Sequence, residues 1–158
     1  MKPPKHILVP VDMSVFSITA LQYAQDIAEL FEADVTIVHV AENGEKEKTR
    51  SHSDADPRLK STIAHLLMDR NLVTRSVTIE IRHGSPAQEI VKASRDLNTD
   101  LVVMCTHGRS GLSHMLMGSV AEKVVRTAAC PVLTLKPDEF RELINVTDED
   151  IKESLHLS

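Results

Sequence analysis

Short apolar runs alternate along the chain with longer segments in which apolar residues recur every three or four positions. The short runs have the length and residue types of β-strands, and the longer segments have the periodicity of helices that pack one face on a sheet. This alternation is typical of α/β domains built around a parallel sheet. Five strands are predicted, at residues 6–11, 34–40, 77–83, 101–105 and 131–135.

Four helices are predicted between these strands. The third has a defined start, with Ser85 as N-cap, Pro86 as the first helical residue and Gln88 as the partner in a capping box. The apolar stripes of the first three helices are Ile18, Leu21, Ala24, Ile27, Ala28 and Phe31; Leu59, Ile63, Leu66 and Leu67; and Ile90, Val91, Ser94 and Leu97.

The pattern within each strand predicts its place in the sheet. Runs 6–11 and 101–105 are almost continuously apolar, as in parallel strands covered on both faces. Run 77–83 alternates apolar and polar residues, and run 131–135 begins with a proline, so both are predicted at or near an edge. Numbered along the chain, the strands therefore take the order 3-2-1-4-5 in a doubly wound sheet with helices on both faces.

Ligands of doubly wound sheets bind at the carboxyl ends of the strands where the strand order reverses. Here these are the first and fourth strands. Asp12 follows the first strand, and the fourth strand leads into the loop from Cys105 to Gly118. A binding site is expected between them.

The helix after this loop is predicted to start with an anion-binding end. Ser119 is expected as its N-cap, with Glu122 completing a capping box. The first N–H groups of a helix have no intrahelical partner and lie at the positive end of its dipole. Three of the chain's five glycines, Gly108, Gly111 and Gly118, lie in the loop and permit close approach of an anion. Read from the residues alone, the alternative is an ordinary strand-loop-helix turn.

Length and charge limit the classes of function. The chain has 158 residues, enough for one domain, predicted over residues 1–137, with a tail over 138–158 and a polar surface loop over 42–56. A net charge of −5 and 3% aromatic residues argue against a nucleic-acid partner. No apolar run approaches the roughly 20 residues that span a bilayer, and no secretory signal is evident, so a soluble cytoplasmic protein is expected.

Cysteine and histidine give no signal of a metal site. Cys105 and Cys130 are expected at opposite ends of the sheet as free thiols. The eight histidines are scattered, and no ligand spacing joins His107 to His114 in the loop. His39 is interpreted as a satisfied core residue and His65 as a surface residue.

With these residues identified, the chain resembles the universal stress protein family over about residues 5–136. The resemblance rests on ILVPVD ending at Asp12, on VHV around Val40, on GSPAQEIV from Gly84, and on THGRSGLSHMLMGSVAEKVV from Thr106. Nucleotide-binding members carry GxxG, nine residues, and then glycine followed by serine or threonine. This chain matches that pattern at Gly108, Gly118 and Ser119, while Cys105 stands at the first glycine.

The resemblance implies a flavodoxin-like (Rossmann-like) fold and the binding of ATP, or of ADP or AMP, with magnesium held through the phosphates. Asp12 would contact the ribose or support the metal through water, Val40 would offer backbone hydrogen bonds to adenine, and Pro10 would shape the base pocket. From the residues alone, Asp12 is equally a turn residue and Val40 a core residue. The remaining implied contacts are Cys105, Thr106, His107, Gly108, Arg109, Ser110 and Gly111 around the ribose and phosphates, and the N–H groups of Gly118, Ser119, Val120 and Ala121 on the phosphate chain.

Three classes of function remain open. The first is a stress-response module that binds ATP and regulates a conformation or a protein partner. The second is a slow ATP hydrolase, although the sequence has no Walker A motif and no pairing of a base with a nucleophile. The third is a nucleotide-free protein that acts through protein contacts. A homodimer through the strand at 131–136, with the tail at or near the interface, is expected because that strand is an unprotected edge, and the family resemblance implies the same contact. The alternative is that the tail beyond Pro137 folds back and covers this edge within one subunit.

Overall fold

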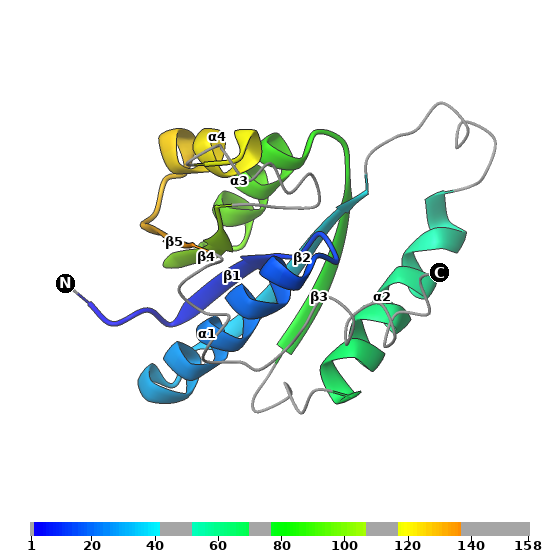
Figure 1. Ribbon diagram of the computed structural model, residues 1–158, viewed down its shortest axis with the longest axis horizontal. Coiled ribbons are helices and arrows are strands. Elements are labelled where there is room, and N and C mark those ends of the chain that lie inside the picture. Colours follow the sequence, from blue (N-terminus) through cyan, green and yellow to red (C-terminus); the bar gives the residue numbers. More distant parts are fainter. Residues whose placement is uncertain (1, 42–51, 70–76, 107–116, 137–158) are drawn as a thin grey trace.

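The computed structural model describes residues 2–41, 52–69, 77–106 and 117–136 (Figure 1). Their strands form a five-stranded parallel sheet in the order β3-β2-β1-β4-β5, which confirms the predicted order. The elements are β1 His6–Pro10, α1 Val15–Phe31, β2 Asp34–Ala41, α2 His52–Asp69, β3 Val77–His83, α3 Pro86–Asp96, β4 Leu101–Cys105, α4 Ser119–Thr127 and β5 Val132–Leu135.

Helices cover both faces of the sheet, as Figure 1 shows. Successive side chains of a strand point to opposite faces, so each central strand supplies both cores. Ile7 and Val9 pack beneath α1 and α2, whereas Leu8 packs beneath α3 and α4, and all three are fully buried. The near-continuous apolar runs of β1 and β4 are therefore explained by burial on two sides.

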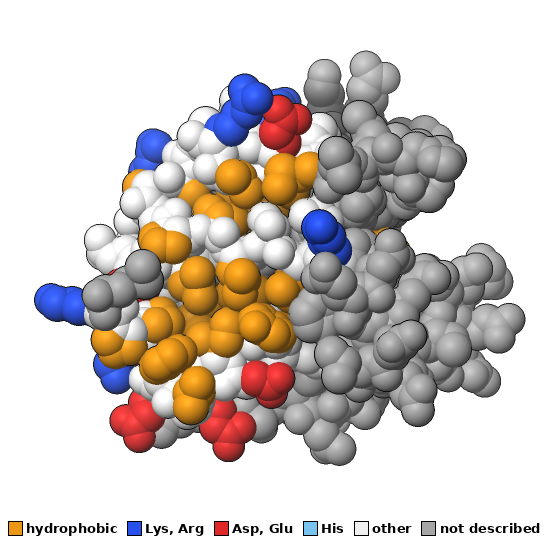
Figure 2. All heavy atoms as spheres, turned by 60° about the vertical axis from the view of Figure 1, so that its left-hand side comes forward, with side chains coloured by type: hydrophobic (Ala, Val, Ile, Leu, Met, Phe, Trp, Pro, Cys, Tyr) orange, Lys and Arg blue, Asp and Glu red, His pale blue; other side chains and the backbone are white. Residues whose placement is uncertain are grey.

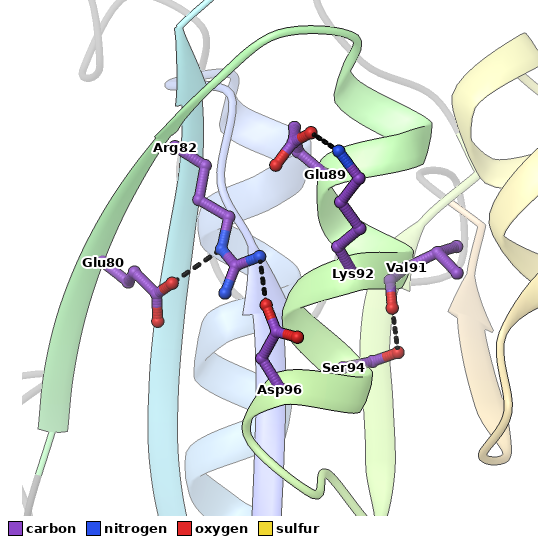
Figure 3. Close-up of polar contacts among 7 residues, drawn as sticks. All are labelled: Glu80, Arg82, Glu89, Val91, Lys92, Ser94 and Asp96. Atoms are coloured by element: carbon purple, nitrogen blue, oxygen red, sulfur yellow. Dashed lines mark hydrogen bonds and ion pairs between the residues drawn. The ribbon is translucent and has the colours of Figure 1, made fainter.

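The edge strand β3 has one apolar and one charged face. Val77, Ile79 and Ile81 pack toward α2, which contacts this strand. On the other face Arg82 donates from Nε to Glu80 Oε1 at 2.6 Å and from Nη1 to Asp96 Oδ2 of α3 at 2.8 Å (Figure 3). These paired charges connect the sheet edge to α3.

Arg82 and Glu80 of this cluster are partly buried, whereas Asp96 is exposed. Partial burial alone would lower the pKa of Arg82, but the hydrogen bonds to Asp96 and Glu80 outweigh it and raise that pKa. On α3 itself, Lys92 pairs with Glu89, and the buried hydroxyl of Ser94 donates to the carbonyl of Val91 at 2.8 Å (Figure 3). A serine is thereby accommodated in the apolar stripe of α3.

Two predicted helix starts differ in detail from the structure. Ser85 is the N-cap of α3 and Pro86 its first residue, as predicted, but the Ser85 side chain makes no capping bond, so the capping box with Gln88 does not form. The polar loop predicted over 42–56 is wrong over 52–56, because α2 already begins at His52. Its first turns are polar and carry no apolar stripe, so the sequence gives no helical period there; residues 42–51 lie outside the described residues.

The described residues contain no disulfide and no membrane-spanning helix. Cys105 and Cys130 are free thiols there, as predicted. Among the helices of the described residues, none is both long and apolar enough to cross a membrane.

Candidate functional site

The carboxyl ends of β1 and β4 lie side by side, because the two strands pair in parallel. Beyond β1, the amide of Val11 donates to the carbonyl of Val38 at 2.9 Å, so the chain stays hydrogen-bonded to β2 as far as the turn at Asp12. The strand order reverses at this point, which is where doubly wound sheets bind ligands.

Thr106 joins three elements at the end of β4. It is buried, its amide donates to the carbonyl of Leu135 in β5 at 2.9 Å, and its own carbonyl accepts from the amide of Gly118 at 2.6 Å. A Cβ at position 118 would lie 2.9 Å from that carbonyl oxygen. Since Gly118 has an ordinary φ of −70°, the contact with Thr106 rather than an unusual backbone conformation requires glycine there.

The N-cap of α4 lies one residue earlier than predicted. Gly118, not Ser119, is the N-cap, and its carbonyl accepts the amide of Glu122 at 2.9 Å. The bond from Gly118 to Thr106 fixes the turn at Gly118, so Ser119 becomes the first helical residue and is exposed. Glu122 pairs instead with Arg126 at 3.2 Å, and the predicted capping box is absent.

This helix start leaves backbone amides available at the carboxyl end of β4. Because Glu122 is the first residue whose amide bonds to a carbonyl of this helix, the amides of Ser119, Val120 and Ala121 have no intrahelical acceptor. They lie at the positive end of the α4 dipole, next to the end of β4. The arrangement suits a phosphate group. The Gly118 amide, expected among these donors, is instead bonded to the carbonyl of Thr106.

Asp12 forms the turn between β1 and α1. Its Oδ1 accepts from the Ser14 amide at 3.0 Å and from the Ser14 hydroxyl at 2.5 Å, and Ser14 in turn caps α1 by accepting from the amide of Ser17 at 3.2 Å. Met13 between them has a φ of +64°, a left-handed conformation that costs a non-glycine residue about 1 kcal/mol. The turn role is thus present in the structure, and a ligand contact by Asp12 belongs to the proposal below.

Cys105 turns its side chain away from the face that carries α4. It belongs to the core beneath α1, and its thiol donates to the carbonyl of Phe16 at 2.6 Å. Burial raises the pKa of this thiol to about 12, a hydrogen bond from the Ala20 backbone opposes the rise, and the charge of Asp12 adds to it. The non-glycine residues with positive φ among those described are Met13, Glu32 and Asn98, so Cys105 stands at the glycine position of the family pattern with ordinary strand geometry.

The remaining candidate residues divide into two groups. Pro10 ends β1, and Val40 lies near the end of β2 against the core beneath α3 and α4; both are half-buried. The structure therefore brings these residues together at the carboxyl ends of the strands, namely Pro10, Asp12, Val40, Cys105, Thr106 and the start of α4. The other candidates, His107, Gly108, Arg109, Ser110 and Gly111, lie outside the described residues, as does His114.

His39 contacts the candidate site, which the sequence interpretation missed. The interpretation as a satisfied residue is confirmed, because Nδ1 lies 2.7 Å from the carbonyl oxygen of Val11, but His39 is half-buried and not a core residue. The available signal was a polar residue in an apolar strand, immediately before Val40. His65 is exposed on α2, as predicted, and no group of three metal-binding side chains occurs within the described ranges.

Sheet order, helix layers and the position of the site define a doubly wound α/β protein of the flavodoxin type. The chain belongs to the universal stress protein family, whose model matches residues 3–136.

Relatives and solved structures agree with this assignment. The chain is 31% identical over 142 residues to universal stress protein MJ0531 of Methanocaldococcus jannaschii, covering 84% of this chain and 82% of that protein. The solved structure of MJ0577, whose biochemical function was assigned from structure, matches with a TM-score of 0.72 at 29% identity and covers 85% of this chain and 97% of its own.

Two further solved structures share the fold at lower identity. A universal stress protein in complex with cAMP has a TM-score of 0.66 at 21% identity, over 85% of this chain and 98% of its own. A universal stress protein of Archaeoglobus fulgidus in complex with dAMP has a TM-score of 0.61 at 20% identity, over 84% of this chain and 98% of its own.

Proposed function

We propose that this protein is a cytoplasmic stress-response module that binds ATP, or another adenine nucleotide, with magnesium held through the phosphates. Occupancy of the site would regulate its conformation or its choice of a protein partner. The observation that carries the proposal is the start of α4, where a main-chain bond between Gly118 and Thr106 fixes the helix amides at the carboxyl end of β4.

The residues at this edge suit the three parts of a nucleotide. The amides of Ser119, Val120 and Ala121 would bind the phosphate chain, and the family resemblance implies further contacts from residues 107–111, which include Arg109. Asp12, after the carboxyl end of β1, would contact the ribose or water bound to magnesium, as the family resemblance implies. The half-buried ends of β1 and β2, at Pro10 and Val40, offer an apolar border and backbone groups to adenine.

Two observations support an adenine nucleotide over another anion. The family pattern of Gly108, Gly118 and Ser119 is kept in this chain. Two solved structures of the same fold are complexes with cAMP and dAMP, both adenine nucleotides. The net charge of −5 agrees with a protein that has neither a nucleic acid nor an anionic membrane as its partner.

The proposal includes a homodimer through β5. This strand pairs with β4 on one side only within the described residues, and Val132 and Leu133 are only partly buried. Figure 2 shows hydrophobic side chains gathered over the side of the molecule where α1, β5 and α4 lie, and Val125 of α4 is 44% exposed. An antiparallel contact with a second copy would close this edge, with the tail 138–158 at or near the interface.

Nucleotide released from freshly purified, heat-denatured protein and identified by mass spectrometry tests the proposal. Recovery of ATP, and of no ADP beyond that of a blank, is expected. Recovery of ADP together with measurable turnover would favour the slow hydrolase. An empty protein that binds no ATP in calorimetry would favour a nucleotide-free interaction protein and contradict the proposal.

A further inference from the structure

His39 and the backbone of β2 together hold the residue that precedes Asp12. The Val11 amide donates to the carbonyl of Val38 at 2.9 Å, and the Val11 carbonyl lies 2.7 Å from His39 Nδ1. Both main-chain polar groups of Val11 are thus bonded to β2, although β1 itself ends one residue earlier, at Pro10.

The chemistry of this contact determines which atom carries the proton. A carbonyl oxygen only accepts hydrogen bonds, so Nδ1 of His39 must carry the hydrogen. Val11 is buried, with 3% of its surface exposed, and a buried carbonyl that loses its donor is costly. Removal of the imidazole therefore acts on the main chain at the end of β1.

The turn after Val11 is the part of the site most sensitive to such a change. Met13 is held at a φ of +64°, and the two bonds from Ser14 to Asp12 Oδ1 depend on that conformation. A strained residue keeps its conformation only while the surrounding structure determines it. The His39–Val11 bond is one of the contacts that anchor this turn.

We propose that His39 is a positioning residue of the nucleotide site, because its Nδ1–H bond to Val11 fixes the turn that presents Asp12. The inference rests on the proposed function in one respect, namely that Asp12 meets the nucleotide or its magnesium. His39 acts through the turn and is not itself a ligand contact.

Two variants and one matched control test the inference. His39→Leu removes the donor, whereas His39→Asn keeps an N–H close to the position of Nδ1. His6→Leu is the control, because the His6 ring is also hydrogen-bonded, to Leu97 O through Nδ1 and to Thr36 Oγ1 through Nε2, but lies at the opposite end of β1.

The first measurement needs no nucleotide. Amide hydrogen exchange of Ser14 reports the bond to Asp12, and we expect it to be about tenfold faster in His39→Leu, close to the original rate in His39→Asn, and unchanged in His6→Leu. Unchanged Ser14 exchange in His39→Leu would overturn the inference, whether or not the protein binds ATP.

The second measurement is the ATP affinity with magnesium. His39→Leu should weaken it about fivefold, His39→Asn should largely restore it, and the loss should disappear in an Asp12→Asn background, since residues that act through one another are not additive. Equal affinities of the original protein and His39→Leu would overturn the positioning role. Absence of ATP binding in the original protein would instead overturn the proposed function, and Ser14 exchange would still decide whether His39 fixes the turn.

Discussion

At the scale of single residues, the site depends on close main-chain contacts. From the sequence, Gly118 is explained by the close approach of an anion. The structure adds a second reason for glycine there, because a Cβ would lie 2.9 Å from the carbonyl oxygen of Thr106. A bulky substitution such as Gly118→Val would therefore disturb the turn as well as the phosphate position, so its effect on binding has no single cause.

We expect Gly118→Ala to lower the free energy of unfolding by about 1–3 kcal/mol, because either Thr106 or the helix start must move. Urea denaturation measures this loss. Ser119→Ala is the matched control, since Ser119 already has a Cβ and is exposed, and its change should stay within about 0.5 kcal/mol. Equal stabilities of Gly118→Ala and the control would show that the Thr106 contact is not tight.

The thiol of Cys105 makes stability depend on alkaline pH. Burial raises the pKa of this thiol from 9.0 to about 12, so its contribution is complete below pH 9 and is lost as the pH rises toward 12. Between these values the original protein should lose stability faster than Cys105→Ala, by at most about 1.4 kcal/mol per pH unit. Urea denaturation at a series of pH values measures the difference; parallel curves for the two proteins would contradict the buried thiol.

The same burial predicts the outcome of restoring the family glycine. Cys105→Gly should leave ATP affinity within about twofold, because the cysteine side chain points into the core beneath α1, and should cost about 1–2 kcal/mol of stability through lost packing and added chain entropy. Calorimetry and urea denaturation measure the two effects. A marked gain in affinity would mean that Cys105 obstructs the ribose.

At the scale of elements, the direction of the main-chain groups of β5 decides which substitution tests the proposed dimer. The carbonyls of Pro131 and Leu135 accept from the amides of Val102 and Thr106, so the odd-numbered residues along β5 direct their main-chain N–H and C=O groups toward β4. In a parallel strand the alternate residues then direct theirs toward the open edge. Thr134→Pro therefore removes an outward donor, whereas Leu133→Pro removes one that faces β4.

We expect Thr134→Pro to be a folded monomer in light scattering, because proline is tolerated on an edge strand but cannot donate to a partner. Leu133→Pro is the comparison variant and should instead destabilise the fold itself. A folded dimer of Thr134→Pro would place the interface elsewhere.

The elements also show how far the sequence predicts the structure. The apolar pattern predicts the bounds of each strand to within about one residue, and it also predicts the strand order. Strands buried on both faces are continuously apolar, whereas strands buried on one face alternate apolar and polar residues. The cap of α4 was predicted one residue late, because a bond from Gly118 to Thr106, twelve positions away, decides it. The role of His39 escapes the sequence for the same reason, since its partner Val11 follows another strand and lies 28 positions away.

At the scale of the whole molecule, the proposed site exists only in the folded sheet. Asp12, Val40 and Thr106 lie at or near the ends of three different strands, and α4 begins beside them. Nucleotide would therefore bind the native state alone and should stabilise it by about 2.7 kcal/mol at a concentration one hundred times the dissociation constant.

The most direct test of the account is calorimetric titration of Ser119→Asp with ATP and magnesium. Aspartate in the first turn favours the helix by about 0.3–1 kcal/mol but opposes a phosphate at the same amides. Ser119→Asn controls for size, and Asn98→Asp, an exposed residue before β4 at the other end of the sheet, controls for charge. We predict that Ser119→Asp melts no lower than the original protein and binds ATP at least about tenfold more weakly, a loss of roughly 1.4 kcal/mol, while both controls bind normally. ATP binding by Ser119→Asp with the affinity of the original protein would contradict a phosphate site at the start of α4.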